Sequence, residues 1–281
     1  MRALLLACAL LFGAHSMAHA SASRIVSLAP NLTELAFAAG AGPRMVGTVE
    51  YSDYPAQARA LPRVGDAFRV DFERLLALRP DAVLVWEPGT PPGVVQRLKD
   101  LRLNVVTIRT HRLADIGAAL RTLGELADTK VQAEAAAQSF EKSIEDLRLE
   151  YSGKPVVTVF LQVNDRPIYT VNGKQIMSEV LTLCGGRNVF ADLNELAPQV
   201  GVEAVIATDP QMIILTGDAQ EAGAAQWQRW KQMTAVRAGN VMLVDADDLA
   251  RSAPRLAQGA ATLCRTLETG RQHLGQLQSA R

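Results

Sequence analysis

Residues 131–151 read VQAEAAAQSFEKSIEDLRLEY, and they predict a single long helix. The stretch contains no proline or glycine and is rich in strong helix formers. At 1.5 Å per residue, such a helix is roughly 30 Å long, about the breadth of a small domain. A flexible linker would be rich in glycine and serine, so this composition predicts a stiff connector between the parts of the chain on either side.

Apolar runs of strand length alternate with helical patterns on both sides of this helix. The runs are IVSLA (25–29), MVGTV (45–49), DAVLVW (81–86) and NVVTI (104–108) before it, and PVVTVFLQV (155–163), QMIILTG (211–217) and NVMLVDA (240–246) after it. This alternation is typical of parallel α/β sheets. The sequence therefore predicts an α/β fold of two Rossmann-like lobes, joined by one long rigid helix, with a ligand cleft between the lobes.

The predicted division of the chain has four parts. They are a leader (1–20), a first lobe (21–127), the connecting helix (128–152) and a second lobe (153–281). In the first lobe, Asn31 and Glu34 have the spacing of a capping pair at the start of a helix.

One phrase occurs twice, as ERLLALRPDAVLV (73–85) and EAVIATDPQMIIL (203–215). Each copy opens on a glutamate, has alanine four residues later and proline seven residues later, and then becomes apolar. Both copies predict a helix, a proline turn and a parallel strand, once in each lobe. An acidic residue near a helix start is favoured by the helix dipole, which would explain Glu73 and Glu203 without a partner. Two helix–strand units alike by chance remain the alternative.

Residues 1–20, MRALLLACALLFGAHSMAHA, have the pattern of a secretory signal peptide. Arg2 precedes an apolar run over residues 3–13, and the segment ends in a small-x-small cleavage site. The run is too short to anchor the chain in a bilayer. We therefore expect an exported, periplasmic protein that is cleaved after about Ala20, with lipidation at Cys8 as the weaker alternative.

The charges are balanced, with 29 basic and 29 acidic residues in the whole chain. Loss of the leader removes one basic residue and leaves a net charge of −1. A nearly neutral chain has no broad attraction for nucleic acid or anionic lipid. We expect a monomer that does not itself bind the membrane surface.

Two cysteines, Cys184 and Cys264, remain after the leader. An even pair in an oxidising compartment favours a disulfide, and both cysteines lie in helical patterns. Two separate buried thiols are the alternative, because the sequence does not show that the cysteines meet.

Enzyme motifs are scarce in this chain. There is no GxSxG elbow, phosphate-binding loop, dinucleotide fingerprint or HExxH sequence. After the leader only His111 and His273 remain, which is too few imidazoles for a dedicated transition-metal site. We expect no metal site and no resident cofactor. An exported hydrolase that uses Asp53 and Asp247 is a remote alternative.

Several aromatic residues fall in loops and at predicted strand ends: Tyr51, Phe68, Trp86 and Tyr169. In open α/β sheets, ligands bind outside the carboxyl ends of the strands. Aromatic residues there favour a large, flat, partly apolar ligand, although each alone could be a core-edge residue. Together with the missing catalytic set, they predict a solute-binding protein of an importer.

The mature chain resembles the vitamin B12-binding branch of the helical-backbone substrate-binding proteins, which deliver ligands to ABC importers. The phrases that carry this resemblance include RIVSLAPNLTELAFAAG (24–40), YSDYPAQA (51–58), ERLLALRPDAVLVW (73–86), VLTLCGGRNVF (180–190) and RSAPRLAQGAATLC (251–264). The wider family also serves ferric siderophores and haem. The resemblance implies capture of cobalamin between two lobes that close little, and delivery to an inner-membrane importer.

The resemblance also implies residue roles in the cleft. Tyr51, Trp86 and Tyr169 would line the corrinoid, with Phe68 close by. Asp247 and Arg251 would hydrogen-bond the amide side chains of the corrin, although Asp247 could instead cap the last helix.

Two further implications concern the rest of the molecule. The family disulfide falls on Cys184 and Cys264. Glu73 and Glu203 would dock on arginines of the two permease subunits.

The chain departs from the family pattern at two positions, where Ala67 and Ala197 stand in place of tryptophans. Cobinamide, haem or a ferric siderophore therefore remains a possible ligand. Arginines in the groove would favour an anionic siderophore, and Arg69, Arg166 and Arg251 are the candidates.

Overall fold

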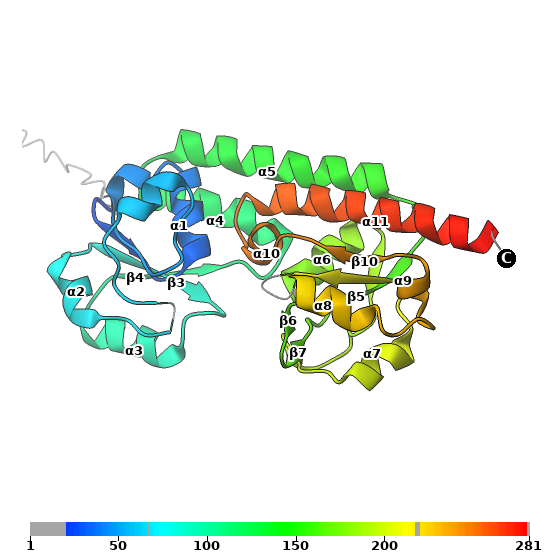
Figure 1. Ribbon diagram of the computed structural model, residues 1–281. Helices are drawn as coiled ribbons and strands as arrows, with labels where there is room; N and C mark the ends of the chain where they lie inside the picture. Colours follow the sequence, from blue (N-terminus) through cyan, green and yellow to red (C-terminus); the bar gives the residue numbers. More distant parts are fainter. Residues whose placement is uncertain (1–20, 67, 217–219, 280–281) are drawn as a thin grey trace, which may run out of the picture.

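The protein is described by a computed structural model that covers residues 21–66, 68–216 and 220–279. Its helices and strands follow the predicted alternation (Figure 1). In chain order the elements are β1 (Ile25–Ser27), α1 (Pro30–Ala38), the 3-10 turn η1 (Gly42–Arg44), β2 (Met45–Gly47), the 3-10 turn η2 (Ala56–Ala60), α2 (Phe72–Ala77), β3 (Ala82–Glu87), α3 (Pro92–Asp100), β4 (Val105–Arg109), α4 (Leu113–Leu126), α5 (Lys130–Tyr151), β5 (Val157–Gln162), β6 (Asn164–Asp165), β7 (Ile168–Tyr169), α6 (Ile176–Leu183), β8 (Gly186–Asn188), α7 (Val202–Thr208), β9 (Met212–Leu215), α8 (Gln220–Trp227), α9 (Thr234–Arg237), β10 (Val241–Leu243), α10 (Ala246–Ala250) and α11 (Leu256–Ser279).

Each lobe contains one four-stranded parallel sheet. The strand order is β2-β1-β3-β4 in the first lobe and β10-β9-β5-β8 in the second. A short antiparallel hairpin, β6–β7, extends from the second sheet region. The predicted fold class, two α/β lobes with parallel sheets, is confirmed.

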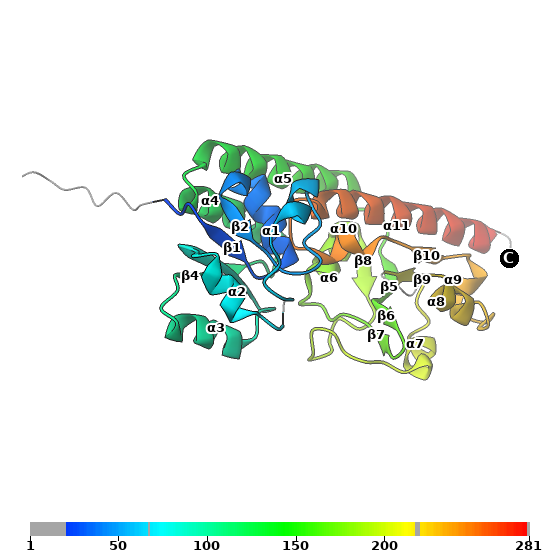
Figure 2. The same cartoon turned by 60° about the vertical axis from the view of Figure 1, so that its left-hand side comes forward.

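The connecting helix α5 spans Lys130–Tyr151, as the sequence predicts. The C-terminal helix α11 lies alongside it, and the two long helices cover the same side of both lobes (Figures 1 and 2). Arg121 of α4 forms ion pairs with Glu134 and Glu141 of α5, at 2.7 and 2.6 Å. These contacts fix the connector against the first lobe.

One apolar core passes from the first lobe into the second. It contains buried side chains of both sheets, such as Leu84 of β3 and Ile214 of β9, and buried faces of α4, α5, α6 and α11. Glu179 of α6 also accepts a hydrogen bond from the backbone N of Leu113, the first residue of α4, at 2.8 Å. The shared apolar core and the hydrogen bond from Leu113 to Glu179 therefore join the two lobes directly. The boundaries at residues 127 and 152 stay a prediction.

Cys184 and Cys264 form a disulfide that joins the end of α6 to the middle of α11. Their Cα atoms are 4.7 Å apart and both residues are fully buried. The bridge closes a segment with a sequence separation of 80 residues.

The start of α1 differs from the sequence prediction. Pro30 is the first helical residue and Ala29 precedes it without a side-chain cap, so Asn31 lies inside the helix and is buried. Proline suits this position because it lacks the N–H that a first helical residue cannot use. The predicted capping pair of Asn31 and Glu34 is therefore wrong.

Among the described residues, no helix has the length and apolar character needed to cross a membrane. The predicted leader at residues 1–20 lies outside the described residues.

Candidate ligand site between the lobes

A cavity of about 320 Å³ lies between the two lobes. The residues that directly follow four strands line it: Pro88 after β3, Thr110 after β4, Val163 after β5 and Thr216 after β9. Parallel sheets place their ligands at the carboxyl ends of strands, and here the ends of both sheets meet at one cavity. Apolar side chains make up most of the remaining lining.

Trp86, near the end of β3, is the large aromatic side chain of this cavity. Its indole N–H donates to Oγ1 of Thr110 at 2.8 Å, and its backbone N–H donates to Oγ1 of Thr90 at 2.9 Å. A Cβ atom at Gly89 would come within 2.1 Å of the indole ring, so only glycine allows this close approach. The ring is therefore held in one orientation before any ligand arrives.

The other predicted aromatic residues are placed differently. Tyr51 and Phe68 are 78% and 72% exposed, in the long loop between β2 and α2. Tyr169 is half-buried in the β6–β7 hairpin and does not line the cavity. Ala197 does line it, whereas Ala67 lies outside the described residues. The structure thus brings Trp86 and Ala197 together.

Asp247 and Arg251 lie side by side at the edge of the cavity, which their neighbours Ala250 and Ser252 line. The guanidinium of Arg251 contacts Oδ1 of Asp247 at 3.1 Å, within α10 and its end. Asp245 caps α10, because it accepts the hydrogen bond from the backbone N of Asp247. That Asp247 caps the last helix, α11, stays a prediction.

Arg251 also reaches across to the first lobe. One Nη donates to the backbone carbonyl of Tyr51 at 3.0 Å and lies 3.4 Å from Oδ1 of Asp53. Asp53 and Asp247, the carboxylates of the hydrolase alternative, therefore both pair with this arginine. None of the three candidate arginines is itself part of the cavity lining. Arg251 lies next to it, because its chain neighbours Ala250 and Ser252 line the cavity, whereas Arg69 and Arg166 are exposed.

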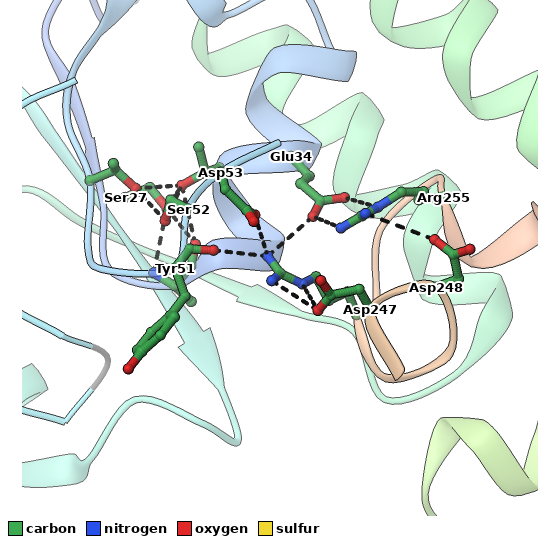
Figure 3. A network of polar contacts seen from close by, with 12 residues as sticks. Ser27, Glu34, Tyr51, Ser52, Asp53, Asp247, Asp248 and Arg255 are labelled. Atoms are coloured by element: carbon green, nitrogen blue, oxygen red, sulfur yellow. Dashed lines mark hydrogen bonds and ion pairs between the residues drawn. The ribbon is translucent and has the colours of Figure 1, made fainter. Parts of the chain in front are cut away.

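Glu34 is the site residue that sequence reasoning missed. Its side chain is only 2% exposed, and it accepts hydrogen bonds from Nη2 and Nε of Arg255 at 2.7 and 3.2 Å. Arg251 lies 3.4 Å from the same carboxylate. Figure 3 shows Glu34 of α1 facing Arg255, with Asp248 on the other side of that arginine.

Burial raises the pKa of the Glu34 carboxyl, although hydrogen bonds and charge from Arg255, and charge from Arg251, oppose the shift. Burial also works against the charge on Arg255, but Glu34 outweighs it and raises the pKa of the guanidinium. Loss of one partner from such a buried pair costs about 3 to 5 kcal/mol, because the other charge is left uncompensated.

Within the ranges that the structure describes, no group of three or more His, Cys, Asp or Glu side chains is placed to hold a metal ion. The arrangement is one for non-covalent binding: a fixed aromatic face, apolar walls and a polar, charged edge.

The sequence matches, over residues 25–247, the profile of a family described as periplasmic binding protein. The chain belongs to the periplasmic binding protein family. This member is a binding protein rather than an enzyme, which agrees with the sequence prediction.

Relatives with known names cover almost the whole of this periplasmic binding protein. The vitamin B12-binding protein of Vibrio cholerae serotype O1 is 35% identical over 267 residues, which is 94% of this chain and 96% of that one. The vitamin B12-binding protein of Salmonella paratyphi A is 36% identical over 247 residues, with 88% and 91% covered.

Solved structures show the same architecture. The crystal structure of the periplasmic vitamin B12 binding protein BtuF of Vibrio cholerae matches with a TM-score of 0.84 and 35% identity, over 89% of this chain and 98% of that one. The periplasmic haem-binding protein BhuT in complex with two haems matches with a TM-score of 0.80 and 25% identity, over 89% and 99%.

Proposed function

We propose that this periplasmic binding protein captures cobalamin or a related corrinoid between its lobes and delivers it to an inner-membrane ABC importer. The observation that carries the proposal is the cavity at the facing strand ends, with the fixed indole of Trp86 in its wall. Relatives that bind vitamin B12 support the same choice of ligand.

A corrin ring is broad and largely apolar, with amide groups at its edge. The face of Trp86 and the apolar walls suit the ring. Tyr51 is a further candidate contact, because its ring is exposed and its backbone carbonyl is bound by Arg251, whose neighbours line the cavity. Asp247 and Arg251 are the candidates to hydrogen-bond the amides. Phe68 and Tyr169 remain candidate contacts outside the cavity. Cobalt would arrive inside the ligand, so the protein itself needs neither a metal site nor a cofactor.

Haem is the second candidate, because the haem-bound BhuT shares the fold at 25% identity. Ala197 supports a different ligand choice, since the small side chain leaves room in the cavity wall. The arginines offer less support for an anionic siderophore, because Arg251 is already paired with carboxylates.

We place the protein in the periplasm after cleavage near Ala20. The pattern of residues 1–20 and the disulfide between Cys184 and Cys264 support export, since disulfides persist in oxidising compartments. We also propose that the permease dimer of the importer is its partner and that Glu73 and Glu203 form the contact surface.

A ligand panel tests the proposal. Purified mature protein is titrated by calorimetry with cyanocobalamin, cobinamide, haem and a ferric siderophore. We expect cyanocobalamin or cobinamide to bind with a Kd below the micromolar range. Binding of haem or the siderophore alone would assign the cleft to that ligand, and binding of none would refute the proposal.

Replacing Trp86 with alanine is expected to weaken corrinoid binding by about ten- to a hundredfold. Burial of a large aromatic side chain is worth about 1.5 to 3 kcal/mol, and each 1.4 kcal/mol is a factor of ten in Kd. Trp86→Phe should lose less, because an aromatic face remains. Trp230→Phe is the matched control, since Trp230 packs in the apolar cluster of the second lobe, outside the cavity. An unchanged Kd for Trp86→Ala in calorimetry would place the ligand elsewhere.

A further inference from the structure

Tyr51 combines a free side chain with a backbone in an unfavourable conformation. Its ring is 78% exposed and its φ is +62°, in the left-handed region that non-glycine residues rarely adopt. Such a conformation costs roughly 1 to 3 kcal/mol and persists only where the surroundings impose it. The contacts that hold the backbone of Tyr51 in this left-handed conformation therefore determine the position of its ring.

Contacts within the first lobe hold the residue that follows. The hydroxyl of Ser52 is buried and accepts a hydrogen bond from Thr48 at 2.8 Å, and Thr48 in turn contacts Thr33 of α1 at 2.6 Å. Arg63 donates to the backbone carbonyl of Ser52 at 3.0 Å. These contacts fix one side of Tyr51 against α1.

The contact on Tyr51 itself comes from the second lobe. Arg251 donates to the Tyr51 carbonyl at 3.0 Å, and its side chain is only 15% exposed. The ring of Tyr51 extends away from this polar network, whose members lie on the opposite side of its backbone (Figure 3). Arg251 therefore holds the backbone of Tyr51 and leaves the ring available.

The carboxylate of Glu34 contacts both Arg251 and Arg255 and holds their guanidinium groups in place. It binds Arg255 through two hydrogen bonds and lies 3.4 Å from Arg251. Arg255 is further fixed by the ring of Tyr54, with its guanidinium carbon 4.5 Å from the ring centre. A buried carboxylate that does not itself line the cavity thus anchors the arginine that binds the Tyr51 backbone.

We propose that Glu34 is a positioning residue for ligand binding: through Arg251 and Arg255 it holds Tyr51 in the left-handed conformation that presents the ring at the edge of the cleft. The proposal rests on the proposed corrinoid-binding function and deepens it. It assigns part of the affinity to a residue with no ligand contact, because a ligand that needs Tyr51 in place binds only the fraction of molecules in which it stands there.

A double-mutant cycle with Glu34→Gln and Tyr51→Ala tests this inference, with cyanocobalamin as the probe in calorimetry. Glutamine keeps the size of the side chain but removes its charge. We expect Glu34→Gln to raise Kd about fivefold, because the fraction with Tyr51 in place falls to about a tenth and the remaining molecules bind about ten times more weakly. Tyr51→Ala should also raise Kd about tenfold. The double variant should match Tyr51→Ala within about threefold, because Glu34 then has no ring to position.

The opposite result is a double variant about fiftyfold weaker than wild type, which would mean that Glu34 acts independently of Tyr51 and would overturn the proposal. An unchanged Kd for Glu34→Gln would overturn it as well. If cyanocobalamin does not bind the wild-type protein, the proposed function fails, and this outcome is separate from both.

Glu134→Gln is the control, because it breaks another arginine–carboxylate pair with two hydrogen bonds, a more exposed one between α4 and α5, away from the cavity. We expect its Kd to be unchanged even where its melting temperature falls. Should Glu34→Gln fail to fold, Arg255→Lys replaces it in the same cycle. Lysine keeps the charge but cannot make the two-pronged bond to Glu34, so the same loss and the same coupling to Tyr51 are expected.

Discussion

Reversal of both charges, Glu73→Lys with Glu203→Lys, is expected to abolish transport while the Kd for ligand stays within about twofold of wild type. Both glutamates are exposed in the first turns of α2 and α7, and each stands nine residues before its strand, β3 or β9. α2 and α7 both lie on the side of the molecule opposite α5 and α11 (Figures 1 and 2). One equivalent charge per lobe suits a two-fold partner.

The measurement is uptake of labelled cyanocobalamin by cells or vesicles that contain the importer, with binding measured separately on the purified variant. Each single reversal should reduce uptake, and the pair should remove it. The control is Glu145→Lys. Glu145 is an exposed acidic residue of α5, on the side of the molecule opposite Glu73 and Glu203. Normal uptake by the double variant would show that these glutamates serve only the helix dipoles. A parallel loss of ligand binding would assign them to the fold or the cleft.

Removal of the disulfide, by Cys184→Ala with Cys264→Ala, is expected to lower the free energy of unfolding by about 4 kcal/mol. The bridge spans 80 residues, so its loss restores a large amount of chain entropy to the unfolded state. Both cysteines are buried between α6 and α11, and alanine leaves small gaps there. For a domain of this size the melting temperature should fall by about 10 °C.

Denaturant titration of the variant and of the wild type measures this loss, and wild-type protein under reducing conditions should approach the variant. A loss below about 1 kcal/mol would show that the packing of α6 on α11 suffices without the bridge. Ligand affinity should change little at 25 °C, since neither cysteine lines the cavity.

Much of the fold follows from local pattern. Apolar runs located seven strands because the strands of a covered parallel sheet are largely apolar, and the glycine-free stretch before Tyr151 located α5. The short strands β6, β7 and β8 were missed because none has an apolar run of strand length. The start of α1 was misjudged because Asn31 and Glu34 have capping spacing, while Pro30 begins the helix one residue earlier. Spacing alone does not show that both side chains are buried.

The site was only partly predictable. Trp86 follows from its place at a strand end, and Arg251 with Asp247 only from the family resemblance. The role of Glu34 depends on Arg255, which is distant in the sequence and meets it only after the lobes pack. Such a long-range pair has no local signal. A charged residue in an otherwise apolar helix face was the one available indication.

The core shared by the two lobes has a consequence for the release of ligand. Separation of the lobes would break the contact between Glu179 and the start of α4 and expose apolar surface of α6, at about 2.5 kcal/mol for each 100 Å² uncovered. Thermal fluctuation rarely supplies several such steps at once. We therefore expect the width of the cleft to change little in the free protein, and under the proposed function the work of opening it would fall to the importer.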